Sequence, residues 1–561
     1  MRRVTHLSSW LALVVFLFFG CASSRDPSDG DKSSGKVPTC VEQTLVPDPA
    51  PDTPVRIDDV DSIVRLGYGT YRVGPGLPYQ TRTDLMPAAY QAASVKRAAT
   101  LLRFFTLTDI HLTDEESPAQ GIVFAPMLGK QGISLYAPLM PYTTQVLDAV
   151  VQTVNAYHRQ HRLDLGLVLG DITNTAQYNE LRWFIDIMDG KTITPYSGGR
   201  KDPVTGPSND FADEFAAAGL DPSIPWYAAI GNHDHFWIGS KRFSEDMRRA
   251  VTGEKILQLP HVLKEDGFIY STGTLDGGKP NAPIIGAGRI DQLTYIPTVV
   301  ADPDRRYVTR DEWMREFVNT TSWPRGHGFA ASVTGKVFNG CYSFLPKSDI
   351  PLKIIVLDDT QSDDPPYQEG IYGHGSLDRG RYEWLMGQLQ SGQEANQLMV
   401  IAAHIPIGVV GDVSPMSWLP VPGAYSTQAE LIERLKAFPN LVLMVAGHRH
   451  LNTVTGFASS DPAHPENGFW QVETKSLREF PEQFRVFEIV LNDDMSLSIV
   501  ATDVDPVMKE GSQASQGRSY AIAANQIYGM DQIPAHGVFN VILYKQVTPV
   551  MREVLAQCVN K

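Results

Sequence analysis

A short polar motif follows each of five apolar runs, and this repetition constrains the fold more than any other feature. The motifs are Asp109-Ile110-His111, Gly170-Asp171, Gly231-Asn232-His233-Asp234, His404 and Gly447-His448-Arg449-His450. An apolar run that ends in polar residues is typical of a buried strand followed by a functional loop. Because parallel strands present their carboxyl ends at one edge of a sheet, we expect the motifs to meet at one site.

The donor atoms in these motifs predict a metal centre. Together the motifs hold three carboxylates, one asparagine and five histidines, but no cysteine. Oxygen and imidazole donors suit borderline divalent ions such as Mn, Fe or Zn. Two such ions about 3.5–4 Å apart can stabilise both the attacking and the leaving oxygen of an in-line phosphoryl displacement. The sequence therefore predicts two divalent metal ions and phosphoester chemistry.

The composition is that of a folded, acidic protein. The 561 residues are 43% hydrophobic and 20% charged, which is ordinary for a globular chain. The formal net charge is −15 and no basic stripe is visible, so we expect no nucleic-acid binding. The partner that we predict is a small phosphoester substrate, and we predict no protein partner.

Periodicity predicts an α/β fold in two parts. The first part has expected strands at 101–108, 165–169 and 226–230, and helices at 143–157 and 178–188. The second has strands at 353–357, 398–402 and 441–445, and helices at 378–389 and 427–438. A hairpin over 485–502, an irregular stretch over 506–537 and a last strand over 538–547 follow.

Four parts are expected along the chain. They are a signal peptide at 1–21, a flexible tether at 22–55, the main domain at 56–505 and a C-terminal extension packed on the core at 506–561. Residues 235–340 show no clear period, so we interpret them as an insertion over the edge that carries the motifs.

The N-terminus resembles a bacterial lipoprotein signal. Arg2 and Arg3 precede an apolar stretch at 10–19 that is too short to span a bilayer, and Gly20-Cys21 follows it. We therefore expect export and lipidation of Cys21, which would anchor the protein at the periplasmic or extracellular face of the cell envelope. An ordinary secretory signal or an uncleaved anchor is the alternative.

Three further cysteines remain, Cys40, Cys341 and Cys558. Export permits a disulfide between Cys40 and Cys558, near the two ends of the folded part, but unpaired buried thiols fit equally well.

The order of the five motifs resembles the calcineurin-like metallophosphoesterase superfamily. That family's pattern is Asp-x-His, Gly-Asp, Gly-Asn-His-Asp/Glu, His and Gly-His-x-His, and all five occur here in this order across 109–450. The resemblance covers the catalytic core without the insertion and both ends. It implies a four-layer α/β/β/α sandwich, here with a large insertion and extra C-terminal strands.

The resemblance also implies roles for the metal ligands. Asp109, His111 and His450 would bind the first metal, Asn232, His404 and His448 would bind the second, and Asp171 would bridge the two. The chemistry agrees, because an aspartate offers two anionic oxygens for a bridge while an asparagine offers a neutral one. Two ions would lower the pKa of a bridging water enough to give a nucleophilic hydroxide near neutral pH.

His233 matches the family's histidine that is not a ligand. It would contact the phosphate and protonate the leaving oxygen, with Asp234 orienting its ring. A purely structural role for His233 is the alternative. Asn174 stands three residues after Asp171, where purple acid phosphatases carry a tyrosine, so a tyrosine-ligated ferric site is not expected.

Outside the motifs, three side chains are candidates for binding the non-reacting oxygens of a phosphate. They are Arg325, His327 and Arg449. For each of them we favour a structural or surface role. Asp358 and Asp359 are interpreted as turn residues.

The sequence thus predicts a metal-dependent phosphoric ester hydrolase that cleaves a phosphate mono- or diester by metal-bound hydroxide at the cell envelope. A nucleotidase or a cyclic-nucleotide phosphodiesterase would use the same ligands. The alternative from another class is a non-catalytic envelope lipoprotein that retains the fold. The complete ligand set favours the enzyme, because a binding module needs no such set.

Overall fold

The computed structural model describes the chain between residues 36 and 559. Within these limits it leaves out 119, 121–131, 134, 200–209, 244–246, 249–250, 255–257, 261–267, 271–274, 277–278, 281–298, 330–339, 363–372, 410–417, 419–424 and 531–538. Val37–Lys561 form one compact unit. The predicted signal peptide and Cys21 lie outside the described residues. Among the residues described, no helix has both the length and the apolar character needed to cross a bilayer.

A seven-stranded sheet carries the first three motifs. Its order is β3-β21-β20-β19-β4-β5-β8. Strands β4, β5 and β8 run parallel to one another, and β3 runs parallel to β21. Between β21 and β4 each strand is antiparallel to the next. The strands are β3 (Gln80–Arg82), β4 (Arg97–Leu107), β5 (Leu165–Val168), β8 (Trp226–Ala228), β19 (Phe484–Asn492), β20 (Leu497–Val504) and β21 (Val541–Lys545).

A six-stranded sheet carries the last two motifs. Its order is β13-β14-β15-β16-β18-β17, with four parallel strands in the middle and an antiparallel strand at each edge. The strands are β13 (Tyr342–Phe344), β14 (Leu352–Val356), β15 (Leu398–Ala402), β16 (Leu441–Ala446), β17 (Thr453–Phe457) and β18 (Phe469–Glu473).

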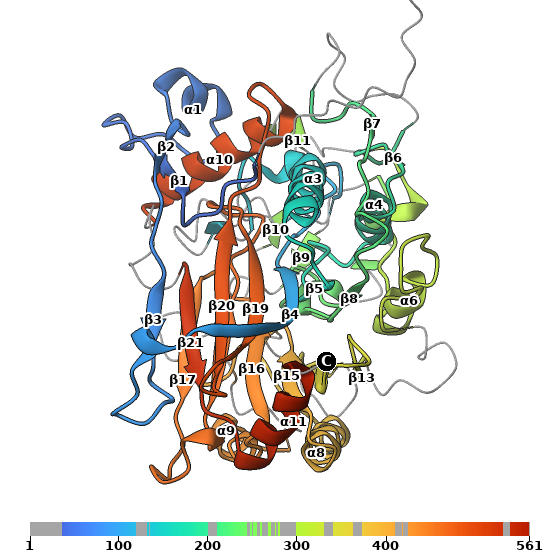
Figure 1. Cartoon of the computed structure of the whole chain (residues 1–561). Coiled ribbons are helices and arrows are strands. Elements are labelled where there is room, and N and C mark those ends of the chain that lie inside the picture. The colour runs from blue at the N-terminus through green and yellow to red at the C-terminus, as the bar shows by residue number, and fades with distance from the viewer. Residues whose placement is uncertain are drawn as a thin grey trace, which may run out of the picture. The chain divides into compact units, whose positions relative to one another are not determined.

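The two sheets pack against each other, and helices cover their outer faces. Along β14, Ile354 joins the main core, whereas Ile355 packs with Leu385 in a separate cluster, as expected for a strand buried on both faces. The helices α8 (Arg379–Glu394) and α9 (Gln428–Leu435) lie on the second sheet, and α3 (Thr143–Gln160) and α4 (Tyr178–Met188) lie near β5 and β8 of the first (Figure 1). The predicted four-layer α/β/β/α fold is confirmed.

Local sequence explains where the helices begin. The Thr427 hydroxyl accepts a hydrogen bond from the Glu430 N–H, and the Glu430 carboxylate accepts from the Thr427 N–H, which forms the predicted capping box of α9. The Asp378 carboxylate accepts from the Arg381 N–H at the start of α8.

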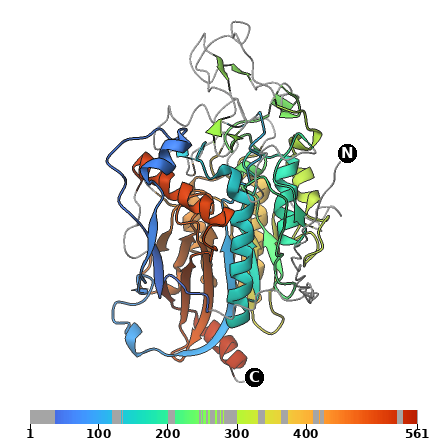
Figure 2. The same cartoon turned by 90° about the horizontal axis from the view of Figure 1, so that it is seen from above.

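The expectation of an irregular stretch over 506–537 is wrong, because a helix, α10 (Gln513–Tyr528), occupies its centre. Its buried residues include four alanines and a glycine beside several polar side chains, so it lacks the bulky apolar period that marks a helix in the sequence. Small residues allow a close approach to α3, and α10 lies beside that helix (Figure 2). A Cβ added at Gly517 would lie 2.9 Å from Cβ of Tyr142.

The expected tether over 22–55 is too long at its C-terminal end. Strand β1 (Gln43–Pro47) pairs with β2 (Tyr71–Pro75), and the N–H of buried Cys40 donates to the Asp503 carbonyl. The folded unit therefore begins at Val37. Among the residues that the structure describes, neither Cys40 nor Cys341 forms a disulfide, and the side chain of Cys558 lies outside them.

The predicted insertion over 235–340 contains part of the core. A capping box starts α6 (Arg310–Glu316), and buried Trp313 and Phe317 join the main core. The short strands β9 (Gln258–Pro260), β10 (Phe268–Tyr270), β11 (Leu275–Asp276) and β12 (Lys279–Pro280) also lie there, while much of the rest is outside the described residues. The remaining elements are α1 (Val60–Leu66), β6 (Thr192–Ile193), β7 (Phe215–Ala216) and α11 (Pro549–Val559).

Candidate metal centre

The loops that follow five strands bring all seven predicted ligands together. Those after β4, β5 and β8 supply Asp109, His111, Asp171 and Asn232, and those after β15 and β16 supply His404, His448 and His450. These side chains are all buried. The site therefore lies where the carboxyl ends of parallel strands from both sheets meet.

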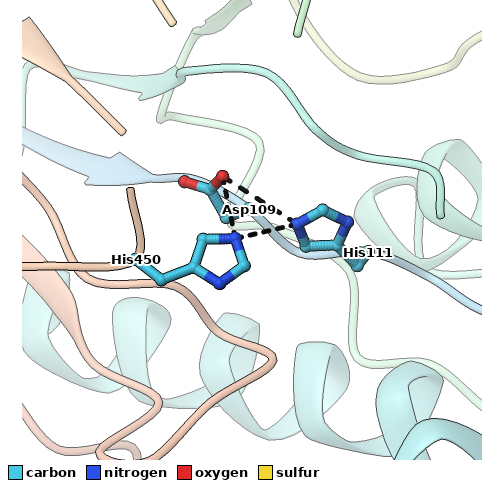
Figure 3. A group of neighbouring side chains, drawn as sticks. All are labelled: Asp109, His111 and His450. Atoms are coloured by element: carbon cyan, nitrogen blue, oxygen red, sulfur yellow. Dashed lines mark hydrogen bonds and ion pairs between the residues drawn. The ribbon is translucent and has the colours of Figure 1, made fainter. Parts of the chain in front are cut away.

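The first group consists of Asp109, His111 and His450 (Figure 3). The Nε2 atoms of the two histidines are 3.1 Å apart, and Nε2 of His450 is 3.3 Å from Oδ1 of Asp109. Nδ1 of His450 is 2.7 Å from the Glu479 carboxylate, which places a proton on Nδ1 and a lone pair on Nε2. A lone pair directed at this group suits a metal ion.

Asp109 divides its two oxygens between the loop and this group. Oδ2 accepts hydrogen bonds from the Thr108 hydroxyl and the His448 N–H. Oδ1 is buried and accepts no hydrogen bond of good geometry from the residues that the structure describes, with Nε2 of His450 as its ion-pair neighbour. A buried carboxylate oxygen without a donor is unfavourable, and a cation bound between Asp109, His111 and His450 would satisfy it.

The second group consists of Asn232, His404 and His448. Oδ1 of Asn232 is 3.0 Å from both Nε2 of His404 and Nδ1 of His448. The Asn232 amide nitrogen donates to the Gly239 carbonyl, which turns Oδ1 toward the histidines. Nδ1 of His404 donates to the Leu169 carbonyl at 2.7 Å and leaves a lone pair on Nε2.

Asp171 lies between the two groups. Its Oδ2 is 3.2 Å from Nε2 of His404 and 3.8 Å from Nε2 of His111. Its Oδ1 accepts a hydrogen bond from the His233 N–H at 2.8 Å. One carboxylate oxygen therefore faces donors from both groups, which is the position that a bridging ligand requires.

Backbone strain is concentrated at these residues. Five of the seven have a positive φ between 48° and 71°, namely Asp109, His111, Asp171, His448 and His450. Non-glycine residues rarely adopt this conformation, and it persists only where the surrounding structure enforces it, often at functional sites. The motif glycines permit the close packing of the loops: a Cβ at Gly231 would lie 2.2 Å from the backbone N of Asp171.

The electrostatics of the centre favour a cation. Burial alone would lower the pKa of His404, but the Asp171 carboxylate outweighs it and raises this pKa to about 10. Burial likewise opposes a charge on His450, but Glu479 and Asp109 raise its pKa to about 9. Groups that hold a proton this strongly lie in a negative potential, as a site for divalent ions requires.

His233 lies beside the centre, but Asp234 does not orient its ring. Nδ1 of His233 donates to the Asn174 carbonyl at 2.8 Å, and the ring meets the His111 ring edge-on. Oδ1 of Asp234 instead accepts from the N–H groups of Ile172 and Thr173. The cause is the short helical turn Asn232–Asp234, which directs Asp234 back at the loop after β5. The orienting role predicted for Asp234 is therefore wrong.

The three candidates for binding substrate oxygens are engaged elsewhere. Arg449 forms a bidentate ion pair with Glu473 at 2.7 and 2.6 Å. His327 stacks on Trp226, and Nε of Arg325 donates to the Val318 carbonyl. The structure therefore supports a structural role for each.

Sequence analysis missed several residues that hold the centre. Glu479 bonds to His450, Asp359 accepts from the N–H groups of His404 and Ile405, and Gly239 fixes the Asn232 amide. The interpretation of Asp359 as a turn residue did not anticipate this contact with the loop after β15. Glu479 lies in an irregular segment with no motif, and only the topology shows that it reaches the site.

Comparison with known proteins supports the same chemistry. Residues 102–337 match the family model of the calcineurin-like phosphoesterases. A dimetal phosphatase from Danio rerio is 12% identical with a TM-score of 0.37, and the match covers 73% of this chain and 98% of that one. GAP50, the anchor in the inner membrane complex of Plasmodium, is 12% identical with a TM-score of 0.28, covering 78% and 98%. Both structural likenesses are weak. No curated protein matches the chain.

The family match ends before β15, yet the ligands predicted beyond it join those within it in one centre. Over residues 102–337 the chain therefore carries a calcineurin-like phosphoesterase domain, the domain of a metal-dependent phosphoester hydrolase, and its clusters of Asp and His could hold two divalent metal ions.

Proposed function

We propose that the protein hydrolyses a small phosphate mono- or diester at the cell envelope, to which a lipid on Cys21 attaches it. Hydrolysis is supported by one observation: Oδ2 of Asp171 lies between two groups of ligand atoms. Neighbouring nitrogen and oxygen atoms of these ligands lie 3.0–3.3 Å apart. Such an arrangement of acceptors needs a positive charge between them, supplied by a metal ion or, without one, by protons on His404 and His450.

The chain's own residues would divide the remaining work. When bound, the two ions would supply Lewis acidity for activating water and stabilising charge on the phosphoryl oxygens. His233, whose Nδ1 is held by the Asn174 carbonyl, would deliver a proton from Nε2 to the leaving oxygen. His233 is 8% exposed, more than any of the seven predicted ligands, so it borders the accessible side of the centre.

The test is a metal analysis combined with a substrate panel on the purified mature protein, loaded with Mn, Fe, Zn or Mg. We expect two metals per chain and hydrolysis of nitrophenyl phosphate or its diester. Two bound metals without hydrolysis of any ester, nucleotide or cyclic nucleotide would instead support the non-catalytic lipoprotein.

The envelope location rests on Arg2, Arg3, the short apolar stretch and Gly20-Cys21. We expect mass spectrometry of the mature N-terminus to find an acylated Cys21. The acyl chains would hold the protein at the membrane, because each buried CH₂ contributes about 0.8 kcal/mol to membrane binding. Cys21→Ser should abolish acyl labelling and leave phosphoesterase activity unchanged. An unmodified Cys21, or a mature chain that starts elsewhere, would contradict the lipid anchor.

A further inference from the structure

Residues 474–479, which we call the crossing segment, follow β18 and run past the metal centre. The Thr474 N–H donates to the Ala446 carbonyl beside β16, and the Ser476 hydroxyl donates to the Asp109 carbonyl after β4. Glu479 then bonds to His450. The crossing segment is thus fixed to both sheets and to two predicted ligands.

This segment carries two cations that form no direct ion pair with any residue that the structure describes, although Glu479 lies near enough to attract both. The Lys475 backbone N–H donates to Asn452, but its ammonium forms no hydrogen bond or ion pair with any residue that the structure describes, and the residue is 7% exposed. Arg478 is 0% exposed, and its guanidinium donates from Nη1 to Oδ1 of Asn174 at 2.9 Å. Its Nε and Nη2 are buried and have no hydrogen-bond partner among the residues that the structure describes.

Other buried arginines show that this is unusual within the protein. Arg381 and Arg485 are also 0% exposed, and they form ion pairs of 2.6 and 2.7 Å with Asp378 and Asp503. An unpaired cation in the interior is costly, so proteins rarely bury one without a partner. The missing partner of Arg478 therefore calls for an explanation beyond folding.

The nearby acids do not form a direct ion pair with Arg478. Glu479 attracts Arg478 from a distance, but its carboxylate is bonded to His450. Glu180 accepts hydrogen bonds from the N–H groups of Asn174 and Thr175, and burial raises its pKa to about 8, so it is largely uncharged at neutral pH. The charge of Arg478 is therefore available to an anion from outside the chain.

Both cations lie close enough to the centre to interact with it electrostatically, Arg478 with His233 and Lys475 with Asp109. Asn174 links Arg478 to His233, since its side chain accepts from Arg478 and its carbonyl accepts from His233 Nδ1. Lys475 precedes Ser476, which is bonded to Asp109. A phosphoryl group bound between the metal ligands and His233 would therefore be bordered by these cations.

We propose that Lys475 and Arg478 make the site selective for phosphate monoesters, with Lys475 binding a non-reacting oxygen of the dianion and Arg478 adding positive charge from behind without touching it. This inference rests on the phosphoesterase activity proposed above. A monoester dianion has an additional anionic oxygen that accepts a charge-assisted hydrogen bond. In a diester that oxygen carries an organic group, which leaves the Lys475 ammonium unpaired and desolvated.

The burial of the two cations supports this selectivity. Burial lowers the pKa of Lys475, and it lowers the pKa of Arg478 to about 10, so the arginine stays charged at neutral pH. The free energy lost by desolvating these charges is recovered when a dianion binds. A monoanion recovers less of it.

The experiment compares Lys475→Gln with a charge-matched control, Lys436→Gln, on the metal-loaded protein. Lys436 lies at the end of α9, where it pairs with the exposed Glu433. The substrates are 4-nitrophenyl phosphate and bis(4-nitrophenyl) phosphate, which share a leaving group. Lys475→Gln should lower kcat/KM for the monoester by roughly 10–100-fold, the range for a hydrogen bond between charged groups, and change the diester less than about 3-fold.

A binding measurement complements the kinetics. Calorimetry with inorganic phosphate should show a Kd that rises by a similar factor in Lys475→Gln, while the metal content stays at two per chain. Arg478→Met should shift the monoester-to-diester ratio in the same direction by a smaller factor. The Lys436→Gln control should change neither measurement.

Equal losses for both substrates at full metal content, or a wild-type protein that prefers the diester, would overturn the inference. A metal-loaded protein that hydrolyses neither ester contradicts the proposed function instead, and phosphate binding then decides the role of Lys475. If Lys475→Gln loses metal, the affinities of the wild-type protein are measured instead. The wild-type protein should bind phenylphosphonate at least about tenfold more tightly than the monoanionic methyl ester of phenylphosphonate. Equal affinities would refute the selectivity.

Discussion

The two halves of the metal centre are supported by different kinds of residues. In the first half, ionised Glu479 lies behind His450: burial opposes its charge, but His450 outweighs this and lowers the pKa of Glu479 to about 2. In the second half, the backbone carbonyls of Leu169 and Gly239 orient the ligands. The residues around the first metal position therefore carry more negative charge than the residues around the second.

This difference predicts that the two ions differ in how tightly they are bound and in their Lewis acidity. Charge behind a ligating imidazole increases its basicity and strengthens its bond to the metal. We therefore expect the ion at the first position to be held more tightly. The ion at the second position is less neutralised by its neutral Asn232 ligand, so it should exchange more readily and act as the stronger Lewis acid.

Asp171→Asn should have the largest effect, because it affects both halves at once. The amide removes the negative charge from an oxygen that faces donors of both groups. We expect loss of nearly all activity and weaker binding of both metals, measured by elemental analysis after gel filtration. An active variant that retains two tightly held metals would disprove the bridging role.

His233→Ala should leave both halves intact and still impair catalysis. Metal content should stay near wild type, while kcat falls by roughly 10²–10⁴, the range for a positioned acid. The loss should shrink for substrates with good leaving groups, which need no protonation. A loss that is independent of the leaving-group pKa would favour the structural alternative, in which His233 only holds Asp171 through its N–H.

The sequence predicted the strands, the helices between them and the convergence of the motifs, because each of these depends on local periodicity. Helix α4 was predicted at 178–188 and spans Tyr178–Met188. Helix α10 was missed because alanine and glycine at a helix interface carry no periodic hydrophobic signal. Its position depends on packing against α3, which is a tertiary property.

The supporting residues could not be predicted, for a related reason. Glu479 and Asp359 are isolated acids in irregular segments, and their partners lie 29 and 45 residues away along the chain. Arg449 was considered for substrate binding because it lies between two ligands, yet it pairs with Glu473 of the neighbouring strand β18. Such pairings depend on how the strands are arranged in the sheet, which the sequence does not state.

Glu479→Gln should affect the first half selectively. The amide cannot supply the negative charge that His450 meets in the wild type, and changes to such supporting residues typically reduce metal affinity by about 10–100-fold. We expect the affinity for one metal to fall by this factor and the affinity for the other to change little, as measured by competition with a chelator. Equal weakening at both positions would contradict the proposed asymmetry.

Asp359→Asn is the matched change in the second half, and we expect the smallest effect there. Burial raises the pKa of Asp359 to about 7, so near neutral pH this group is already partly protonated, and the substitution removes less charge than Glu479→Gln does. One amide oxygen can still accept from the N–H groups of His404 and Ile405, whose present distances to Asp359 are 3.1–3.3 Å. Loss of one such neutral contact costs about 0.5–1.5 kcal/mol, which corresponds to roughly a 2–10-fold change in affinity for the second metal. The same chelator competition measures it. A larger loss than in Glu479→Gln would show that the second position, rather than the first, depends more on its supporting carboxylate.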